Sequence, residues 1–268
     1  MRWEELTGDE FVRQVERVEG VCLLPFSCIE RHAHHLPLGT DMFIAREICR
    51  RAAEVEPVVI FPDFIFTQIL EARHCAGTIA IDPELIVRLC ENVLREIARN
   101  GLNKIILVNA HGGNRFLMGF LTQIQMASPR DYVLYAWQPR ALPEEEAEIR
   151  AQWESQVDGH AGESETSLIM AIRPDLVQRS ELRADGEGQP LGRLDELRAA
   201  GLTTGIWWYA DHPTHYRGDG TPGTPDKGER QLDAVARALV QAIRLVKRDN
   251  TSKQLQDEFF AASGAPGA

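Results

Sequence analysis

The stretch Lys104-Ile-Ile-Leu-Val-Asn109, continued by Ala110-His-Gly-Gly-Asn114, says most about the fold of this 268-residue sequence. Its first part is a continuous apolar run, which predicts a buried strand, and a helical pattern over 115–126 follows the glycines. A strand, a glycine turn and then a helix is where open α/β sheets bind ligands. The stretch therefore predicts both a fold class and one edge of a functional site.

Similar units lie on both sides of this stretch. Further strands are predicted at 20–26, 57–61, 79–81 and 132–137, and helices at 42–56, 83–99, 115–126, 143–154, 164–172 and 232–246. Short apolar runs that alternate with helical patterns are typical of βαβ units around a mostly parallel sheet. The sequence therefore predicts an α/β protein.

One domain over 1–250 is expected from the length and the ordinary composition, with 44% hydrophobic and 26% charged residues. Within it, 179–200 is polar and weakly periodic, which predicts a lid or excursion. The tail 251–268 is expected to dock on a partner subunit or to fray.

The composition also bears on partners and location. A net charge of -11 argues against a nucleic-acid or anionic-membrane partner. Five cysteines without CxxC spacing, no signal-peptide pattern and no long apolar run indicate a cytoplasmic protein with reduced thiols. No nucleotide-binding glycine motif and no Gly-x-Ser-x-Gly elbow are present.

Three segments carry side chains that suit a metal site. Glu30 and His32 are two residues apart, so an extended chain places them on one side, and Asp41 follows a turn-rich segment. His111 follows a strand, and the segment 160–167 offers His160 and Glu165. Two histidines with three carboxylates suit Zn, Mn, Fe or Ni. Singly, each could be an ordinary loop or core residue; together they favour a two-metal site.

The remaining histidines and cysteines have simpler interpretations. From the residues alone, His74, His212 and His215 are taken for hydrogen-bonded loop or core histidines. Cys28 and Cys75 lie beside the candidate site, where inert packing is the expected role and a nucleophile the alternative.

In these segments the chain resembles the creatininase (creatinine amidohydrolase) family. Its Glu-x-His-Gly-x-His-Leu-Pro-Leu-x-Thr-Asp, Asn-Gly-His-Gly-Gly-Asn and His-Ala-Gly-x-x-Glu-Thr-Ser patterns match 30–41, 109–114 and 160–167, and weaker similarity lies at 77–79 and 222–228. The resemblance implies a three-layer α/β/α sandwich with a mostly parallel central sheet. It also implies a homo-oligomer, in this family usually a hexamer.

The resemblance assigns roles to single residues. It implies two divalent metal ions (Zn, Mn or Fe), one held by Glu30, Asp41 and His111 and the other by His32, Asp41 and Glu165. Asp41 would bridge the ions, and a hydroxide between them would attack a carbonyl. Catalytic roles fall to Glu165 and to His160, which would shuttle a proton or hold the substrate, and Trp137 would line the pocket.

Departures from the family pattern bear on the substrate. Gly113 stands where creatininase itself has a glutamate, and Gln156 where it has a tryptophan, which argues against creatinine. Arg31 and Ala33 replace the usual Gln and Gly. Polar groups in 67–74, with Glu71 and His74, suit a hydroxylated substrate, and His35 is a further candidate substrate contact.

The leading hypothesis is therefore a metal-dependent hydrolase that opens a cyclic amide or related small carbonyl ring by attack of the metal-bridging hydroxide. An alternative is hydrolytic carbon–carbon ring opening of an oxidised inositol. From a different class, the chain could be a metal-binding subunit without catalysis. In either enzyme hypothesis the partner is a small-molecule substrate.

Overall fold

A computed structural model, which describes residues 1–183 and 186–264, places a four-stranded sheet at the centre of the chain. The strand order is β2-β1-β3-β4, and all pairs are parallel. The strands are β1 (Val21–Phe26), β2 (Val59–Ile60), β3 (Lys104–Asn109) and β4 (Val133–Trp137). The β1–β3 register runs from Val21 opposite Lys104 to Phe26 opposite Asn109, so both strands end at the same edge. The predicted parallel sheet is confirmed.

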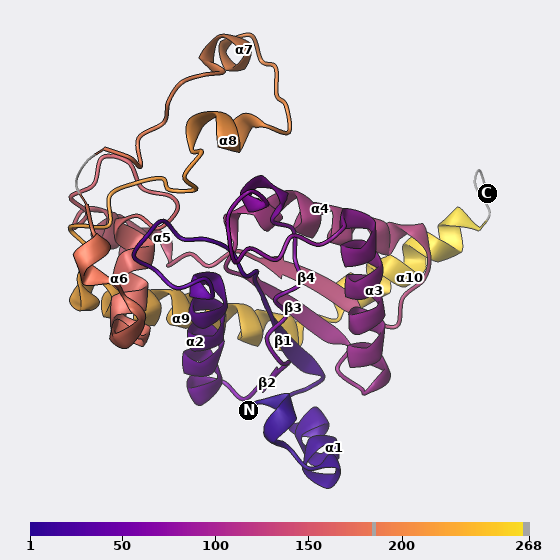
Figure 1. The fold of residues 1–268 in the computed structure, drawn as a ribbon. Helices are drawn as coiled ribbons and strands as arrows, with labels where there is room; N and C mark the ends of the chain where they lie inside the picture. Colours follow the sequence, from indigo (N-terminus) through magenta and orange to yellow (C-terminus); the bar gives the residue numbers. More distant parts are fainter. Residues whose placement is uncertain (184–185, 265–268) are drawn as a thin grey trace.

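Helices cover both faces of the sheet, which gives three layers (Figure 1). Alternate strand residues face opposite sides, so Leu23 joins one apolar cluster and Leu24 the other. The first cluster packs against α2 (Thr40–Val55), α5 (Pro143–Arg150), α6 (Glu163–Ile172) and α9 (Pro225–Arg248). The second packs against α1 (Gly8–Arg17), α3 (Pro83–Arg99) and α4 (Arg115–Gln123). This is the three-layer α/β/α sandwich that the resemblance implied.

Short 3₁₀ helices complete the connections. They are η1 (Trp3–Glu5), η2 (Leu70–Ala72), η3 (Gly112–Asn114), η4 (Ile124–Ala127), η5 (Pro174–Leu176) and η6 (Arg179–Glu181). Of these, η3 forms the turn between β3 and α4, where the sequence predicts a glycine turn.

One predicted strand is wrong. Residues 79–81 form no strand, although the Ile79 amide donates to the Ile29 carbonyl at 3.0 Å. Because β1 is already paired on both sides by β2 and β3, a further segment cannot join it. The predicted strand at 57–61 is also shorter than expected, since only Val59–Ile60 pairs with β1.

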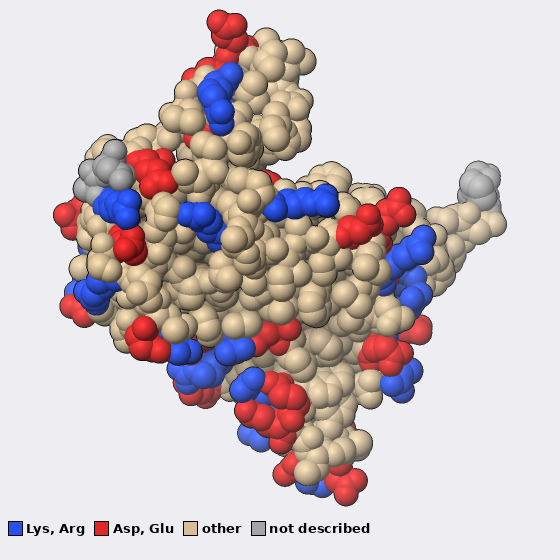
Figure 2. All heavy atoms as spheres, viewed as in Figure 1, with Lys and Arg blue, Asp and Glu red and all other residues tan. Residues whose placement is uncertain are grey.

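A long excursion between α6 and α9 stands away from the body (Figures 1 and 2). We define it as residues 178–217. It contains α7 (Asp195–Ala199) and α8 (Trp207–Asp211), while 184–185 lie outside the described residues. The predicted lid at 179–200 is the first part of this excursion. Lysine, arginine and carboxylate side chains are interspersed over the face in Figure 2.

The C-terminal tail is helical where it is described. Helix α10 (Thr251–Ser263) has no buried residue, and 265–268 of the predicted tail lie outside the described residues. Over Thr251–Ser263 the chain is therefore helical and not frayed. Docking on a partner subunit and assembly as a homo-oligomer or hexamer stay predictions. None of the described helices is long and apolar enough to cross a membrane.

Candidate metal centre

The candidate centre forms where β1 and β3 end. Glu30 follows β1 and His111 follows β3, so the two side chains emerge side by side at the carboxyl edge of the parallel sheet. Asp41 lies in the first turn of α2, where the helix dipole favours a carboxylate. The three side chains are almost completely buried. The sequence expectation that these segments meet at one sheet edge matches this placement.

Asp41 lies between two histidines and presents one oxygen to each. Its Oδ2 is 3.1 Å from His111 Nδ1, and its Oδ1 is 3.3 Å from His32 Nε2. Glu30 Oε1 is 2.8 Å from the same His111 nitrogen, and Glu165 Oε2 is 3.7 Å from His32 Nε2. The structure thus brings all five predicted metal ligands into two half-clusters that share Asp41.

Polar side chains hold the turn that carries His111. Asn109 accepts from the His111 amide at 3.3 Å and from Asn114 at 3.0 Å, and it donates to the His111 carbonyl at 2.8 Å. Asn114 also donates to Thr67, which donates to the Ser27 carbonyl behind β1. These bonds satisfy buried polar groups and fix the position of His111.

Gly113 leaves space that other side chains fill. A Cβ at this position would lie 2.4 Å from both His111 Nε2 and Glu71 Oε1. His111 Nε2 is buried and has no hydrogen-bond partner among the described residues. Here the edge of the His111 ring and the Glu71 carboxylate fill the space beside Gly113.

His160 is held as a neutral ring. Its backbone forms a pair of 2.9 Å hydrogen bonds with Arg217, and its Nε2 lies 2.8 Å from the Arg31 carbonyl. Because a carbonyl can only accept, Nε2 carries the proton and Nδ1 carries the lone pair. Burial, together with the neighbouring His32, lowers the pKa of His160 to about 3. His160 Nε2 is 3.9 Å from Glu30 Oε2, which places His160 beside the cluster.

His215 belongs to the site, although its sequence context predicts an ordinary loop or core histidine. The Trp208 indole N–H donates to His215 Nδ1 at 2.8 Å, so His215 Nε2 must carry a proton, and this nitrogen contacts Glu30 Oε2. His215 is 1% exposed. The excursion therefore reaches the metal-ligand cluster through a Trp208–His215–Glu30 chain. No motif marks His215; the neighbouring tryptophans were the only signal.

The backbone is strained around the centre. Among the described residues, the non-glycine residues with positive φ are Glu19, Ala33, Ala161 and His215, and the last three flank the site, with φ of 50°, 55° and 58°. This region costs about 1–2 kcal/mol for an L-residue. At Ala33 the strain explains why the family usually has glycine there. Such strain often accompanies functional sites.

The buried carboxylates of the cluster need positive charge nearby to balance their negative charge. Burial opposes ionisation of Glu30, but His111 and His160 outweigh it and keep its pKa well below the usual range. Burial likewise opposes protonation of His32, yet Asp41 raises its pKa to about 9. The pKa of His111 is raised for the same reason, against its burial, by Cys28 and Glu30. With the chain's own groups alone, protons on two histidines supply the charge that buried carboxylates require.

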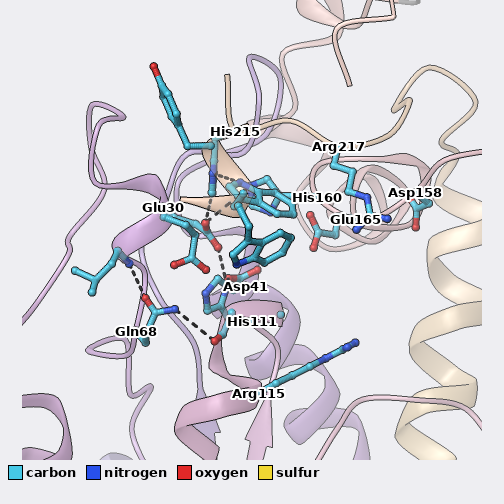
Figure 3. A pocket seen from close by; sticks show the side chains of 18 of the residues that line it. Glu30, Asp41, Gln68, His111, Arg115, Asp158, His160, Glu165, His215 and Arg217 are labelled. Carbon is cyan, nitrogen blue, oxygen red and sulfur yellow. Dashed lines mark hydrogen bonds and ion pairs between the residues drawn. The ribbon is translucent and has the colours of Figure 1, made fainter. Parts of the chain in front are cut away.

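A cleft of about 1550 Å³ opens over the cluster (Figure 3). Its floor contains Glu30, Asp41, His111, His160, Glu165 and His215. Its walls are aromatic and cationic, with Phe116, Trp153, Trp207, Trp208, Tyr209, Arg73, Arg115, Arg150 and Arg217. The part of the excursion that lines the cleft is 205–217, beyond the predicted lid at 179–200.

Two of the predicted substrate contacts line this cleft and two do not. Glu71 and His74 are in its wall, as is Gln156. Trp137 ends β4 and packs against the first apolar cluster, because strand alternation turns it toward the helices. His35 is 2% exposed and contacts Thr166 at 2.9 Å, so it fastens the loop to α6. Trp137 and His35 therefore lie outside the lining of this cleft, and their contact with substrate stays a prediction.

A parallel α/β sandwich with carboxylates and histidines gathered at the carboxyl edge of its sheet defines an α/β protein with a candidate two-metal centre, a class that includes many hydrolases. Comparison with known proteins narrows this class. The creatininase family model, described as creatinine amidohydrolase, matches residues 4–243, so the chain belongs to the creatininase family.

Relatives of this chain are hydrolases of two kinds. Creatinine amidohydrolase of Pseudomonas putida is 27% identical over 65% of this chain and 72% of that protein. The mycofactocin precursor peptide peptidase of Mycobacterium ulcerans is 31% identical over 78% of each chain. A solved creatinine amidohydrolase superposes with a TM-score of 0.75 at 20% identity, covering 93% of this chain and 98% of that one. The chain is therefore an enzyme of the hydrolase class.

Proposed function

We propose that this chain is a metal-dependent hydrolase of an amide or related carbonyl bond, and that its substrate is a small cyclic amide or carbonyl ring other than creatinine. The observation that carries the proposal is Asp41, whose two oxygens face His111 on one side and His32 on the other. A carboxylate in that position can bridge two ions. Family membership supports hydrolysis as the reaction.

The donor set fits a pair of divalent ions. Glu30, Asp41 and His111 would hold one ion, and His32, Asp41 and Glu165 the other. Their buried carboxylates need positive charge, which two divalent ions provide in place of the histidine protons. Solved creatininases, at 20–21% identity, are described as a Mn form and as a Zn-Zn form. Ions bound here would supply Lewis acidity, which polarises a carbonyl and makes water acidic enough to attack.

The chain's own residues supply positioning. His160 is neutral and is held by the Arg31 carbonyl beside Glu30, so it can hold the substrate over the cluster, one of the two roles that the family resemblance gives this histidine. Glu165 would act as a ligand, and burial raises the pKa of its free carboxyl to about 8, so metal binding there displaces a proton. His215, oriented by Trp208, holds Glu30 in place.

A second candidate substrate is a peptide, and the size of the cleft favours it. Small-molecule pockets usually measure about 300–1000 Å³, and the cleft here is about 1550 Å³. The relatives that cover most of this chain, at 28–31% identity, are peptide peptidases. Hydrolysis of a peptide amide uses the same cluster and differs only in how the walls hold the substrate.

The test combines metal analysis with a substrate panel. Purified protein should contain transition metal, lose turnover in chelator and regain it with added Zn²⁺ or Mn²⁺. The panel contains cyclic amides including creatinine, an inositol-derived diketone and short peptides; turnover of the diketone would favour carbon–carbon ring opening instead. Protein without bound transition metal, together with a Glu30→Gln variant as active as the parent, would overturn the proposal.

A further inference from the structure

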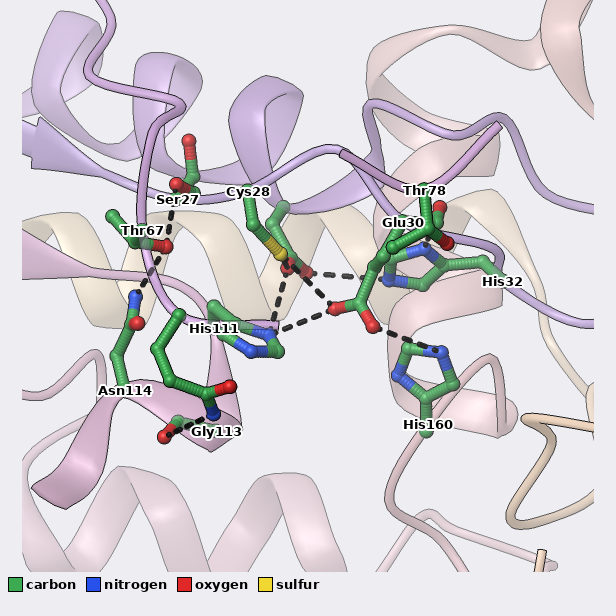
Figure 4. A network of polar contacts seen from close by, with 12 residues as sticks. Ser27, Cys28, Glu30, His32, Thr67, Thr78, His111, Gly113, Asn114 and His160 are labelled. Carbon is green, nitrogen blue, oxygen red and sulfur yellow. Dashed lines mark hydrogen bonds and ion pairs between the residues drawn. The ribbon is translucent and has the colours of Figure 1, made fainter. Parts of the chain in front are cut away.

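Cys28 lies inside the half-cluster that contains His111. Its side chain is 0% exposed, and its sulfur is 3.3 Å from Glu30 Oε1 and 3.3 Å from Asp41 Oδ2. Donor atoms of Cys28, Glu30, Asp41 and His111 all lie within 4.8 Å of one another. Figure 4 shows the side chains of Cys28, Glu30 and His111 pointing toward one another. The thiol therefore faces the same point in space as the two carboxylates and the imidazole.

The distances agree with four donors around one ion. Bonds of about 2.0 Å to oxygen or nitrogen and about 2.3 Å to sulfur, in a tetrahedron, separate neighbouring donors by roughly 3.3–3.5 Å. Here the sulfur–oxygen separations are 3.3 Å, and His111 Nδ1 lies 2.8 Å and 3.1 Å from the two carboxylates. Small movements of the side chains complete such a tetrahedron.

The other half-cluster has no such group. Within the described part of the chain, the donors grouped around His32 are His160 and Glu165, without a cysteine. Cys75, the other thiol near the site, contacts His74 Nε2 at 3.4 Å and belongs to none of the donor groups. Of the two thiols, only Cys28 is placed to reach an ion, and only in the half with His111.

We propose that Cys28 is the fourth protein ligand of the ion held by Glu30, Asp41 and His111, so that this position selects zinc over manganese. The inference rests on the proposed function, because it assigns a residue to the same centre. The thiol proton passes to solvent as the sulfur–metal bond forms, and no group changes oxidation state. A thiolate prefers a softer ion, whereas the oxygen-rich half with Glu165 also suits manganese.

Cobalt spectroscopy tests the inference without relying on activity. Metal-stripped protein titrated with Co²⁺ alone should develop a near-ultraviolet sulfur-to-cobalt charge-transfer band together with the visible d–d bands. Cys28→Ser should lose the charge-transfer band and keep the d–d bands, and the matched control Cys75→Ser should keep both. A band that survives in Cys28→Ser, or d–d bands without a charge-transfer band in the parent protein, would overturn the inference and leave the metal centre standing.

A competition titration measures the selectivity. Removal of the sulfur should shift the preference for Zn²⁺ over Mn²⁺ by about tenfold or more, the order of effect seen for groups that support a metal site. Circular dichroism of the metal-free parent and variant checks that both fold, and Cys28→Ala serves if the serine variant does not. An unchanged preference contradicts the inference. If the parent protein binds none of these ions, the proposed function fails and the inference with it.

Discussion

The floor of the cleft and its outer wall are built in opposite ways. The floor residues Glu30, Asp41 and His111 are almost completely buried and are fixed by two strand ends and a helix start. The outer wall is the part of the wall that belongs to the excursion, where Ile206 and Trp207 are about half exposed and α8 is five residues long.

This difference suggests that the floor carries metal binding and catalysis, while the outer wall carries substrate recognition. Buried, hydrogen-bonded ligands keep the geometry that metal binding requires. Exposed side chains on short helices can change without disturbing the core, and such segments are where binding specificity commonly varies. Changes in the floor should therefore alter metal content and turnover, and changes in the wall should alter substrate affinity.

Asp41→Asn should have the largest effect. The amide nitrogen cannot act as a ligand in place of an oxygen, so the bridge between the half-clusters is broken. The expected loss of several kcal/mol of charge stabilisation corresponds to about 1000-fold in kcat. Turnover and metal content measure this effect. Asp63→Asn, which changes a carboxylate paired with Arg46 and outside the donor groups and the cleft lining, is the control and should match the parent. Full metal content in Asp41→Asn would show that Asp41 is not a bridge.

Gly113→Ala should reduce metal affinity by about 10- to 100-fold, as loss of a group that orients a ligand does. The new methyl group would meet the His111 ring and the Glu71 carboxylate at 2.4 Å and displace them. Gly112→Ala is a matched control, because nothing lies within 4 Å of the added Cβ. Titration of metal-stripped protein compares the two. Equal affinities would mean that the floor tolerates movement of His111.

Trp208→Phe should lower kcat by roughly tenfold. It removes the N–H group that holds His215 in the tautomer that donates to Glu30. This variant tests the side-chain link from the excursion to Glu30 in the floor. Trp207→Phe, a neighbour whose indole N–H donates to no other described residue, should keep kcat near the parent value. Steady-state kinetics on both variants measure kcat and KM. If Trp208→Phe changes KM alone, Trp208 contributes to substrate binding only and does not support Glu30.

Ile206→Ser should have the smallest effect, a rise in KM of a few-fold, because it removes part of an apolar contact surface worth about 1 kcal/mol. Metal content and kcat should stay unchanged. Leu202→Ser, equally exposed on the same excursion but outside the cleft lining, is the control. A fall in metal content for Ile206→Ser would contradict the separation of floor and wall.

The sequence was sufficient for the parts of the molecule that strands position. Glu30 and His111 follow apolar runs, and strand ends of a parallel sheet must meet at one edge. Asp41 follows a segment that cannot continue a helix, and the structure places it at the start of α2. For these residues, the local sequence pattern is enough to predict the position in the fold.

The sequence was insufficient where position depends on distant packing. His215 reaches Glu30 from 185 residues away through a turn with positive φ, which no periodic pattern reveals. The family resemblance implies that Trp137 lines the pocket, but its side chain lies on the face of β4 that packs against the first apolar cluster. His35 sits in a histidine-rich loop, and only its contact with Thr166 shows that it faces inward.

The excursion is fastened to the body at both of its ends, close to the metal centre. The Gln178 amide donates to the His35 carbonyl at 2.8 Å, and Arg217 forms its paired backbone bonds with His160. A segment exchanged between these two anchors, with Gln178 and Arg217 as the junctions, leaves the sheet and the five ligands in the chain but must keep Trp208 and His215, which hold Glu30. Grafting the corresponding segment of a relative with a different substrate offers a direct route to engineered specificity.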